Sequence, residues 1–290
     1  MTTEQAAALS TTFIGSLLSA QVGQMETADI AALSTISLNA LTSAQVAGLK
    51  SSQVAALSAD QVTGLTSSFV SYLTSAQTAG LTTAAINAMT TANVVGLTAT
   101  QVVGLGAAQV AKLSTGNLNA LSTAAVAALT TGQVTALTSD QLGGLSTTQV
   151  GALTTRQLAS LSTSSIGSLT TANISGITSQ QVAGLTTVQI GSLASAKLLA
   201  LATSAVSSLS AAQIAALNTT QANNLSSTFV GALTASQLGY LEAADAAALS
   251  TATVAALTTV QTAGLKTTQI SALTTSQVNA FSTDAIGALS

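Results

Sequence analysis

Residues 41–57 read LTSAQVAGLKSSQVAAL, and in this stretch Leu, a hydroxyl residue, Gln, Val and a small residue return after eight positions. Steps of eight from Leu9 to Leu289 reach 36 positions, (289 − 9)/8 + 1, and all of them are apolar. Of these, 32 are Leu, and the variants are Met25, Met89, Ile177 and Phe281. No insertion or deletion breaks this phase, so each eight-residue repeat occupies an equivalent environment and stacks on its neighbours. This is typical of a solenoid.

One repeat has the features of a short capped helix. Thr42 takes the N-cap position and Gln45 the N3 position of a capping box, while Leu41 and Val46 form the hydrophobic staple that accompanies it. Ser or Thr fills the cap position in 28 of 37 cases and Gln fills N3 in 20 of 36. An uninterrupted helix would wind the Leu stripe around its axis, because eight residues are not a whole number of turns. The sequence therefore predicts an all-α solenoid of about 36 octapeptide repeats, each a short capped helix.

A β-solenoid is the alternative, because Thr and Val are good strand formers and Gln could form ladders between coils. Leu and Val alternate at spacings of five and three residues, however, which places them on opposite faces of a plain strand. Helices are therefore favoured. The small pair before each Leu, such as Ala47 and Gly48, predicts close approach of backbones. No linker or composition shift divides the chain, so residues 1–290 are expected to form one continuous domain, with an unknown number of repeats per superhelical turn.

The composition excludes several classes of function. The 290 residues contain no Pro, Cys, His or Trp, charged residues are 4% of the chain, and the net charge is −3. A nucleic-acid or polybasic membrane surface needs clustered Lys and Arg, of which there are 5. Mean hydropathy is high at +0.59, but Ser, Thr or Gln interrupts every few positions, so no transmembrane span is expected. The first residues lack the basic and apolar regions of a classical signal peptide.

Two matching acidic pairs are the strongest candidates for chemistry. Glu26 with Asp29 and Glu242 with Asp245 occupy the N-cap and N3 positions of their repeats. One interpretation is a weak cation site, and the other, which is favoured, is that these carboxylates replace Thr and Gln as caps. Two carboxylates without further oxygen ligands hold Ca²⁺ poorly. No His is present to activate a hydroxyl nucleophile. We therefore expect no catalytic, cofactor-binding or metal-binding residues, and no enzyme.

The aromatic and basic residues are few. Their positions suit either exposed anchors for a partner or local packing variants, and packing is favoured for the aromatic ones; the scattered basic residues read as aids to solubility. Phe replaces Gln at N3 in three repeats, at Phe13, Phe69 and Phe229, and Tyr replaces a small residue before Leu in two, at Tyr72 and Tyr240. Lysines occupy two cap positions, Lys50 and Lys266, and the other basic residues are Lys112, Arg156 and Lys197.

The repeats LTSAQVAGL (41–49), LTTGQVTAL (129–137) and LSTTQVGAL (145–153) resemble the LTTAQVAAL-type tandem arrays of long bacterial surface or secreted proteins. Such proteins are often labelled haem-utilisation or adhesion proteins. The resemblance implies an extracellular, adhesin-like or spacer role. Its haem aspect has no support here, because His and Cys, the usual axial ligands, are missing. The missing classical signal peptide implies another secretion route or a chain that is part of a longer one.

The sequence thus predicts a non-enzymatic structural repeat protein, an extracellular or cell-surface rod, spacer or adhesin-like stalk. Its expected partners are other copies of itself, end to end or laterally, or cell-surface glycans, because the polar face is a neutral array of Ser, Thr and Gln. The alternative is a Thr-rich array that binds ice or a crystalline polysaccharide, which requires a flat β face.

Overall fold

The computed structural model describes residues 1–289, and these form 36 short α-helices with no β-strand among them. Each helix has four to six residues and lies within one octapeptide. The predicted all-α solenoid is confirmed. The β-solenoid alternative is wrong, and the flat β face that ice or polysaccharide binding required is not found in the described part of the chain.

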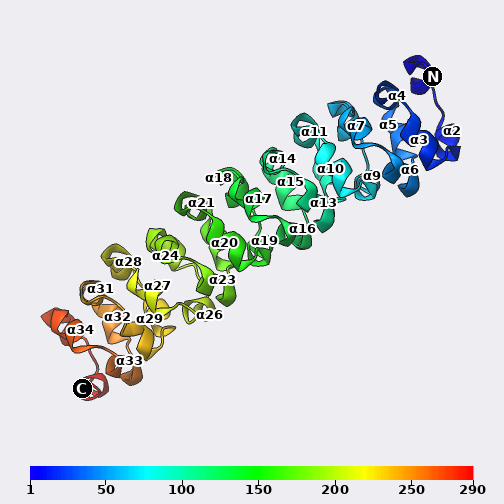
Figure 1. Cartoon of the computed structure of the whole chain (residues 1–290). Helices are drawn as coiled ribbons and strands as arrows, with labels where there is room; N and C mark the ends of the chain where they lie inside the picture. Colours follow the sequence, from blue (N-terminus) through cyan, green and yellow to red (C-terminus); the bar gives the residue numbers. More distant parts are fainter. Residues whose placement is uncertain (290) are drawn as a thin grey trace. The chain divides into compact units, whose positions relative to one another are not determined.

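The chain divides into two compact units, residues 1–145 and 146–290. In Figure 1 the helices of each unit follow one another in chain order along the stack of that unit. The helices of the first unit are α1 (Thr3–Ala7), α2 (Thr11–Ser16), α3 (Ser19–Gln24), α4 (Thr27–Ala32), α5 (Thr35–Asn39), α6 (Ser43–Gly48), α7 (Ser51–Ala55), α8 (Ala59–Thr63), α9 (Ser67–Tyr72), α10 (Ser75–Gly80), α11 (Thr83–Ala88), α12 (Thr91–Val94), α13 (Ala99–Gly104), α14 (Ala107–Val110), α15 (Thr115–Ala120), α16 (Thr123–Ala128), α17 (Thr131–Thr135) and α18 (Ser139–Gly143).

The second unit continues the same pattern of short helices. They are α19 (Thr147–Ala152), α20 (Thr155–Ser160), α21 (Thr163–Ser168), α22 (Thr171–Ser175), α23 (Ser179–Gly184), α24 (Thr187–Ser192), α25 (Ser195–Leu198), α26 (Thr203–Val206), α27 (Ala211–Ala215), α28 (Thr219–Asn223), α29 (Ser227–Gly231), α30 (Ala235–Leu238), α31 (Ala243–Ala248), α32 (Thr251–Ala255), α33 (Thr259–Ala263), α34 (Thr267–Ala272), α35 (Thr275–Val278) and α36 (Thr283–Gly287). That residues 1–290 act as a single domain stays a prediction.

The predicted capping boxes start these helices. In α6 the Thr42 side chain accepts a hydrogen bond from the Gln45 backbone N–H, and the Gln45 side chain accepts one from the Thr42 backbone N–H at 2.8 Å. Each helix then ends at a C-cap residue at or just before the next seam position. Leu49, the C-cap of α6, has an extended backbone with φ −62° and ψ 141°. Leu41 and Val46, the staple pair, are both buried. Because helices this short are unstable alone, burial of the Leu and Val/Ile seam against neighbouring repeats stabilises the fold.

The superhelical period, which the sequence left open, lies between three and four repeats. Within each unit, helices three repeats apart pack on each other, as α10 does on α7 and α13. Ser51 Oγ donates to the Ala76 carbonyl 25 residues later, and Gln77 Nε2 donates to the Leu49 carbonyl 28 residues earlier. The hydrogen bonds between turns therefore join residues 25 to 31 positions apart, which is between three and four repeats.

Small residues at the helix ends make this close stacking possible, as the sequence predicted. A Cβ added to Gly48 at the end of α6 would lie 2.9 Å from the Ser19 carbonyl oxygen in α3. A Cβ added to Gly23 in α3 would in turn lie 2.6 Å from the Gly48 carbonyl oxygen. Real Cβ atoms do not approach a backbone oxygen so closely. These glycines are therefore required by contact between turns, and none of them has a positive φ.

Gly104→Ala and Gly231→Ala are expected to change stability in opposite directions, although both glycines end a helix. At Gly104 the new Cβ would lie 2.7 Å from the Ser75 carbonyl oxygen, so the turns must separate, at a cost of about 1–3 kcal/mol. At Gly231 nothing lies within 4 Å, so alanine should stabilise by about 0.5–1 kcal/mol through helix propensity. Urea titration monitored by circular dichroism measures both. Equal effects would show that turns do not meet at Gly104.

Candidate functional site

A buried glutamine at N3 connects successive turns of the solenoid. The Gln133 side chain is 2% exposed. Its Oε1 accepts from the Thr130 backbone N–H at 2.7 Å, and its Nε2 donates to the carbonyls of Val102 and Leu105 at 2.7 and 2.6 Å. These carbonyls lie 31 and 28 residues earlier, at the C-terminal end of α13, and the Val102 carbonyl also accepts from the Leu105 backbone N–H at 3.2 Å. The last carbonyls of a helix lack the partner that a further helical turn would supply. The Gln133 side chain thus caps the N-terminus of its own helix, α17, and the C-terminal end of α13, four repeats earlier.

We call this arrangement a glutamine rung: an N3 Gln whose Oε1 accepts from its N-cap N–H and whose Nε2 donates to the carbonyl 28 residues earlier. Glutamine rungs with a second bond 31 residues earlier recur at Gln45, Gln53, Gln61, Gln77, Gln101, Gln133, Gln141, Gln181, Gln189, Gln213, Gln221, Gln261 and Gln269.

Sequence reasoning found the capping half of the rung and missed the half that joins turns. A signal for it was present: a capping box accepts Glu as readily as Gln, yet none of the 36 N3 positions holds Glu. Gln supplies an N–H₂ donor that a carboxylate lacks. Lys197, read from sequence as a residue for solubility, is a second sign of the same need. It stands at N3, and its Nζ donates to the Gly167 carbonyl 30 residues earlier.

The two acidic pairs do not behave as caps, which corrects the favoured interpretation. Glu26 and Glu242 stand at the N-caps of α4 and α31, but neither side chain accepts a cap hydrogen bond. Asp29 and Asp245 take the buried N3 position and are 2% and 3% exposed. The Met1 ammonium lies 4.0 Å from Asp29 Oδ2. Among residues 1–289, no three acidic, His or Cys side chains gather as metal ligands, so each pair offers two carboxylates alone.

Burial, and after it the negative charge of Glu242, raise the pKa of Asp245 to about 6. The folded state thus holds this proton more tightly than the unfolded chain. Stability is highest where Asp245 is protonated and falls as pH rises from about 4 through about 6.

Asp245→Asn is expected to stabilise the chain by about 1–3 kcal/mol above pH 6, with the gain vanishing near pH 4. Asp140→Asn is the control, because Asp140 is exposed at N2 of α18, where the helix dipole favours a carboxylate. That change should be neutral or slightly destabilising. Thermal unfolding of both variants between pH 4 and 8 measures the difference, and a gain from Asp245→Asn that does not vary with pH would refute the burial of a charged carboxylate.

The aromatic residues divide by location. Phe69 and Phe229 are 2% and 3% exposed and fill the place of a rung glutamine, so the packing interpretation is confirmed for them. Phe13 is 48% exposed, so the packing interpretation does not describe it. Tyr72 and Tyr240 are exposed, and Lys266 Nζ lies 5.3 Å from the centre of the Tyr240 ring. This cation–π contact gives Lys266 a local packing role.

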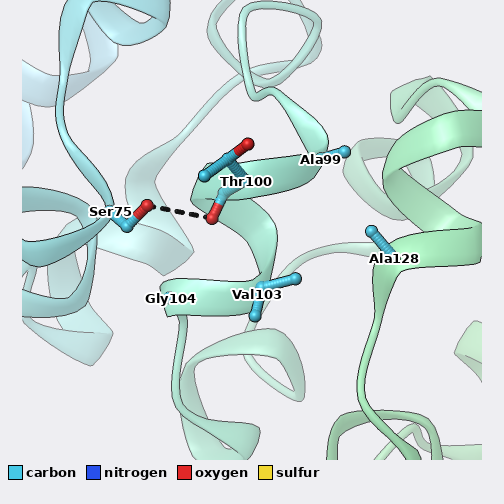
Figure 2. A pocket seen from close by; sticks show the side chains of 6 residues that line it. All are labelled: Ser75, Ala99, Thr100, Val103, Gly104 and Ala128. Atoms are coloured by element: carbon cyan, nitrogen blue, oxygen red, sulfur yellow. Dashed lines mark hydrogen bonds between the residues drawn. The ribbon is translucent and has the colours of Figure 1, made fainter.

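Two hollows on the surface carry little chemistry, whereas a third is lined in part by Met1, Glu26 and Asp29. One of about 460 Å³ is lined by Ser75, Ala99, Thr100, Val103, Gly104 and Ala128. In Figure 2 the Ser75 hydroxyl donates to the Thr100 carbonyl, at 3.0 Å, and Val103 lies between this pair and Ala128. None of the six can act as a general acid or base at neutral pH. A second hollow of about 430 Å³ includes Arg156, which is exposed.

One known repeat family is similar to parts of this chain. The ALTTAQ repeat model matches four segments, residues 22–59, 110–147, 238–275 and 261–290. Each matched segment contains consecutive capped helices of the solenoid. No curated protein compared with the chain matches it. These four matches are consistent with a tandem-repeat protein of the LTTAQ type, and they cover less than half of the chain. In residues 1–289, no helix is long and apolar enough to cross a membrane.

Proposed function

We propose that this chain is a non-enzymatic structural repeat protein that serves as an extracellular spacer or adhesin-like stalk. The observation that carries the proposal is the glutamine rung. Its donors and acceptors, like those of the Ser and Thr caps, form hydrogen bonds with the backbone of the same molecule in repeat after repeat. A protein organised in this way uses its polar side chains to stack one repeat on another. Its length can therefore change by whole repeats without loss of any single site.

The spacer role is tested by changing the length of the chain in phase. Deletion of residues 82–137 removes seven whole repeats, or about two superhelical turns, and joins Leu81 to Thr138. The shortened chain should keep the same helical signal per residue in circular dichroism and the same cooperativity. Deletion of residues 82–133, which breaks the phase by half a repeat, is the control and should lose helices at the junction. If both deletions unfold the chain, the repeats are not interchangeable and the spacer proposal fails.

The extracellular location is tested on intact cells of the source organism. An antibody raised against the purified chain should label intact cells as strongly as permeabilised cells, and external protease should remove the label. Labelling that appears only after permeabilisation would contradict the location. The exposed Ser and Thr hydroxyls make cell-surface glycans the expected contact, and loss of cell binding after deglycosylation of the target surface would support this partner.

A further inference from the structure

The hollow that contains Arg156 offers no acid or base for catalysis, but it has the features of a binding site for an anion. Its volume is about 430 Å³, and most of its lining comes from α20 and α23 with their N-caps, two helices of the second unit that pack on each other. Its eight lining residues include an arginine and no acidic residue. The polar ones are Thr154, Thr155, Arg156, Thr178, Gln180 and Gln181. The hollow therefore has one formal charge, which is positive.

Arg156 differs from the other basic side chains of the second unit, because they have partners within the chain. Lys197 Nζ donates to the Gly167 carbonyl, and Lys266 Nζ lies against the Tyr240 ring. The Arg156 side chain is exposed and makes no ion pair or hydrogen bond with any residue in the described part of the chain. Its planar guanidinium, with five N–H donors, is therefore available to an outside anion.

The Thr155 hydroxyl beside Arg156 is also available. At the same N1 position of another repeat, the Ser75 hydroxyl donates to the Thr100 carbonyl 25 residues later, at 3.0 Å. The corresponding acceptor for Thr155 is the Gln180 carbonyl, and no such bond forms between these two described residues. This hydroxyl therefore keeps both its proton and its lone pairs for a ligand.

The two N-cap threonines of the hollow keep a donor as well. The Thr154 hydroxyl accepts from the Gln157 backbone N–H at 3.2 Å, and the Thr178 hydroxyl accepts from the Gln181 backbone N–H at 3.3 Å. Neither hydroxyl donates to another residue of the described chain, so each retains its proton for an outside acceptor. The hollow thus surrounds one cation with neutral groups that both donate and accept hydrogen bonds.

We propose that this hollow binds a hexuronate residue, a sugar that carries one carboxylate. The guanidinium of Arg156 would hold the carboxylate through two parallel N–H···O bonds, which suit a planar anion. The threonine hydroxyls and the exposed Gln180 amide would pair with the hydroxyls of the sugar ring. A volume of about 430 Å³ is larger than an inorganic ion needs, and a single positive charge matches a single carboxylate.

This inference rests on the proposed cell-surface role for the source of its ligand. It narrows the expected glycan partner from any surface sugar to one that contains hexuronate.

Arg156 is the one arginine in the sequence, so its Nε–Hε signal in a ¹H–¹⁵N NMR spectrum reports on this hollow alone. The experiment titrates the 290-residue chain with D-glucuronate at constant ionic strength and pH 7. The Arg156 signal should shift and saturate. Glucose, which has the ring without the carboxylate, should leave it in place. Acetate, which has the carboxylate without the ring, should bind about tenfold more weakly, because the bonds to the sugar hydroxyls are missing.

Arg156→Gln tests the charge, with ligand-observed saturation-transfer NMR as the readout of binding. It should weaken glucuronate binding about tenfold or more, because hydrogen bonds to a charged group are lost. Arg156→Lys keeps the charge without the planar fork and should bind several-fold more weakly than the parent. Lys112→Gln is the matched control, because it removes one charge at an exposed position outside the hollow, and it should bind like the parent. Circular dichroism of all three variants should equal that of the parent.

An Arg156 signal that does not move with glucuronate would overturn the inference. Equal affinity for acetate and glucuronate would also overturn it, since the hollow would then hold an adventitious ion only. Equal losses in Arg156→Gln and Lys112→Gln would mean general attraction of charge and no site, and tighter binding of glucose 6-sulfate would contradict the choice of a carboxylate. None of these results bears on the spacer role or the location, which the length-change and cell-labelling experiments test separately.

Discussion

Gln181→Glu is expected to destabilise the second unit by about 3–5 kcal/mol, while Gln180→Glu, the same change one residue earlier, should be neutral or slightly stabilising. Gln181 is 3% exposed, and its Nε2 donates to the carbonyls of Val150 and Leu153. Glutamate there loses both donors and turns a buried carboxylate toward two carbonyl oxygens. Gln180 is exposed at N2 of α23, where the helix dipole favours an acid.

Urea unfolding at pH 7 and pH 4 measures this pair of variants. The loss from Gln181→Glu should shrink at the lower pH, because a protonated glutamate recovers one donor for the carbonyls. Native-state hydrogen exchange should localise the loss to α23 and the turns beside it, since repeat proteins lose structure locally. Equal effects of the two substitutions would mean that the glutamine rung does not join the turns.

The second large effect is expected from Leu129→Asp, which places an unpaired carboxylate in the apolar seam. Leu129 is 3% exposed at the C-cap of α16. Loss of its apolar burial and desolvation of the charge together should cost about 4 kcal/mol or more. Thr131→Asp, at N1 of α17, lies outside the seam at the positive end of a helix and should change stability by less than about 0.5–1 kcal/mol.

Denaturant titration of both variants, with the helical signal followed at each step, gives the comparison. A first transition that involves a fraction of the helical signal should appear in Leu129→Asp, because neighbouring repeats keep their own seam. Similar stability of Leu129→Asp and Thr131→Asp would show that the eight-residue phase does not define the core.

Local structure was predictable because each octapeptide contains its own start and stop signals. Thr42, Gln45, Leu41 and Val46 define cap, N3 and staple within six residues, and the structure uses all four as expected. The superhelical period was not predictable, because it depends on contacts between repeats that lie three or four places apart in the chain. An eight-residue pattern repeats identically whatever the rotation between repeats, so it does not reveal which repeats meet.

The roles of individual residues were predictable where they depend on the octapeptide alone, and not where they depend on contacts between turns. Phe69 was correctly placed in packing, but Phe13, with the same local sequence signal, is exposed. Glu26 and Glu242 stand at cap positions without capping, because a cap hydrogen bond depends on side-chain geometry as well as position. Lys197 was read as a surface charge, whereas a carbonyl 30 residues earlier holds it. Contacts between turns decide the cases of Phe69 and Lys197, and they cannot be seen in one octapeptide.

Electron paramagnetic resonance distances in the second unit test the central claim, that the chain turns back on itself every three to four repeats. A spin label at Gln180 is paired with a second label either two repeats later, at Ala196, or three repeats later, at Ser204; all three positions are exposed at N2. Because α23 packs on α26, the pair separated by three repeats should give the shorter distance. A distance that grows with sequence separation would contradict the superhelix.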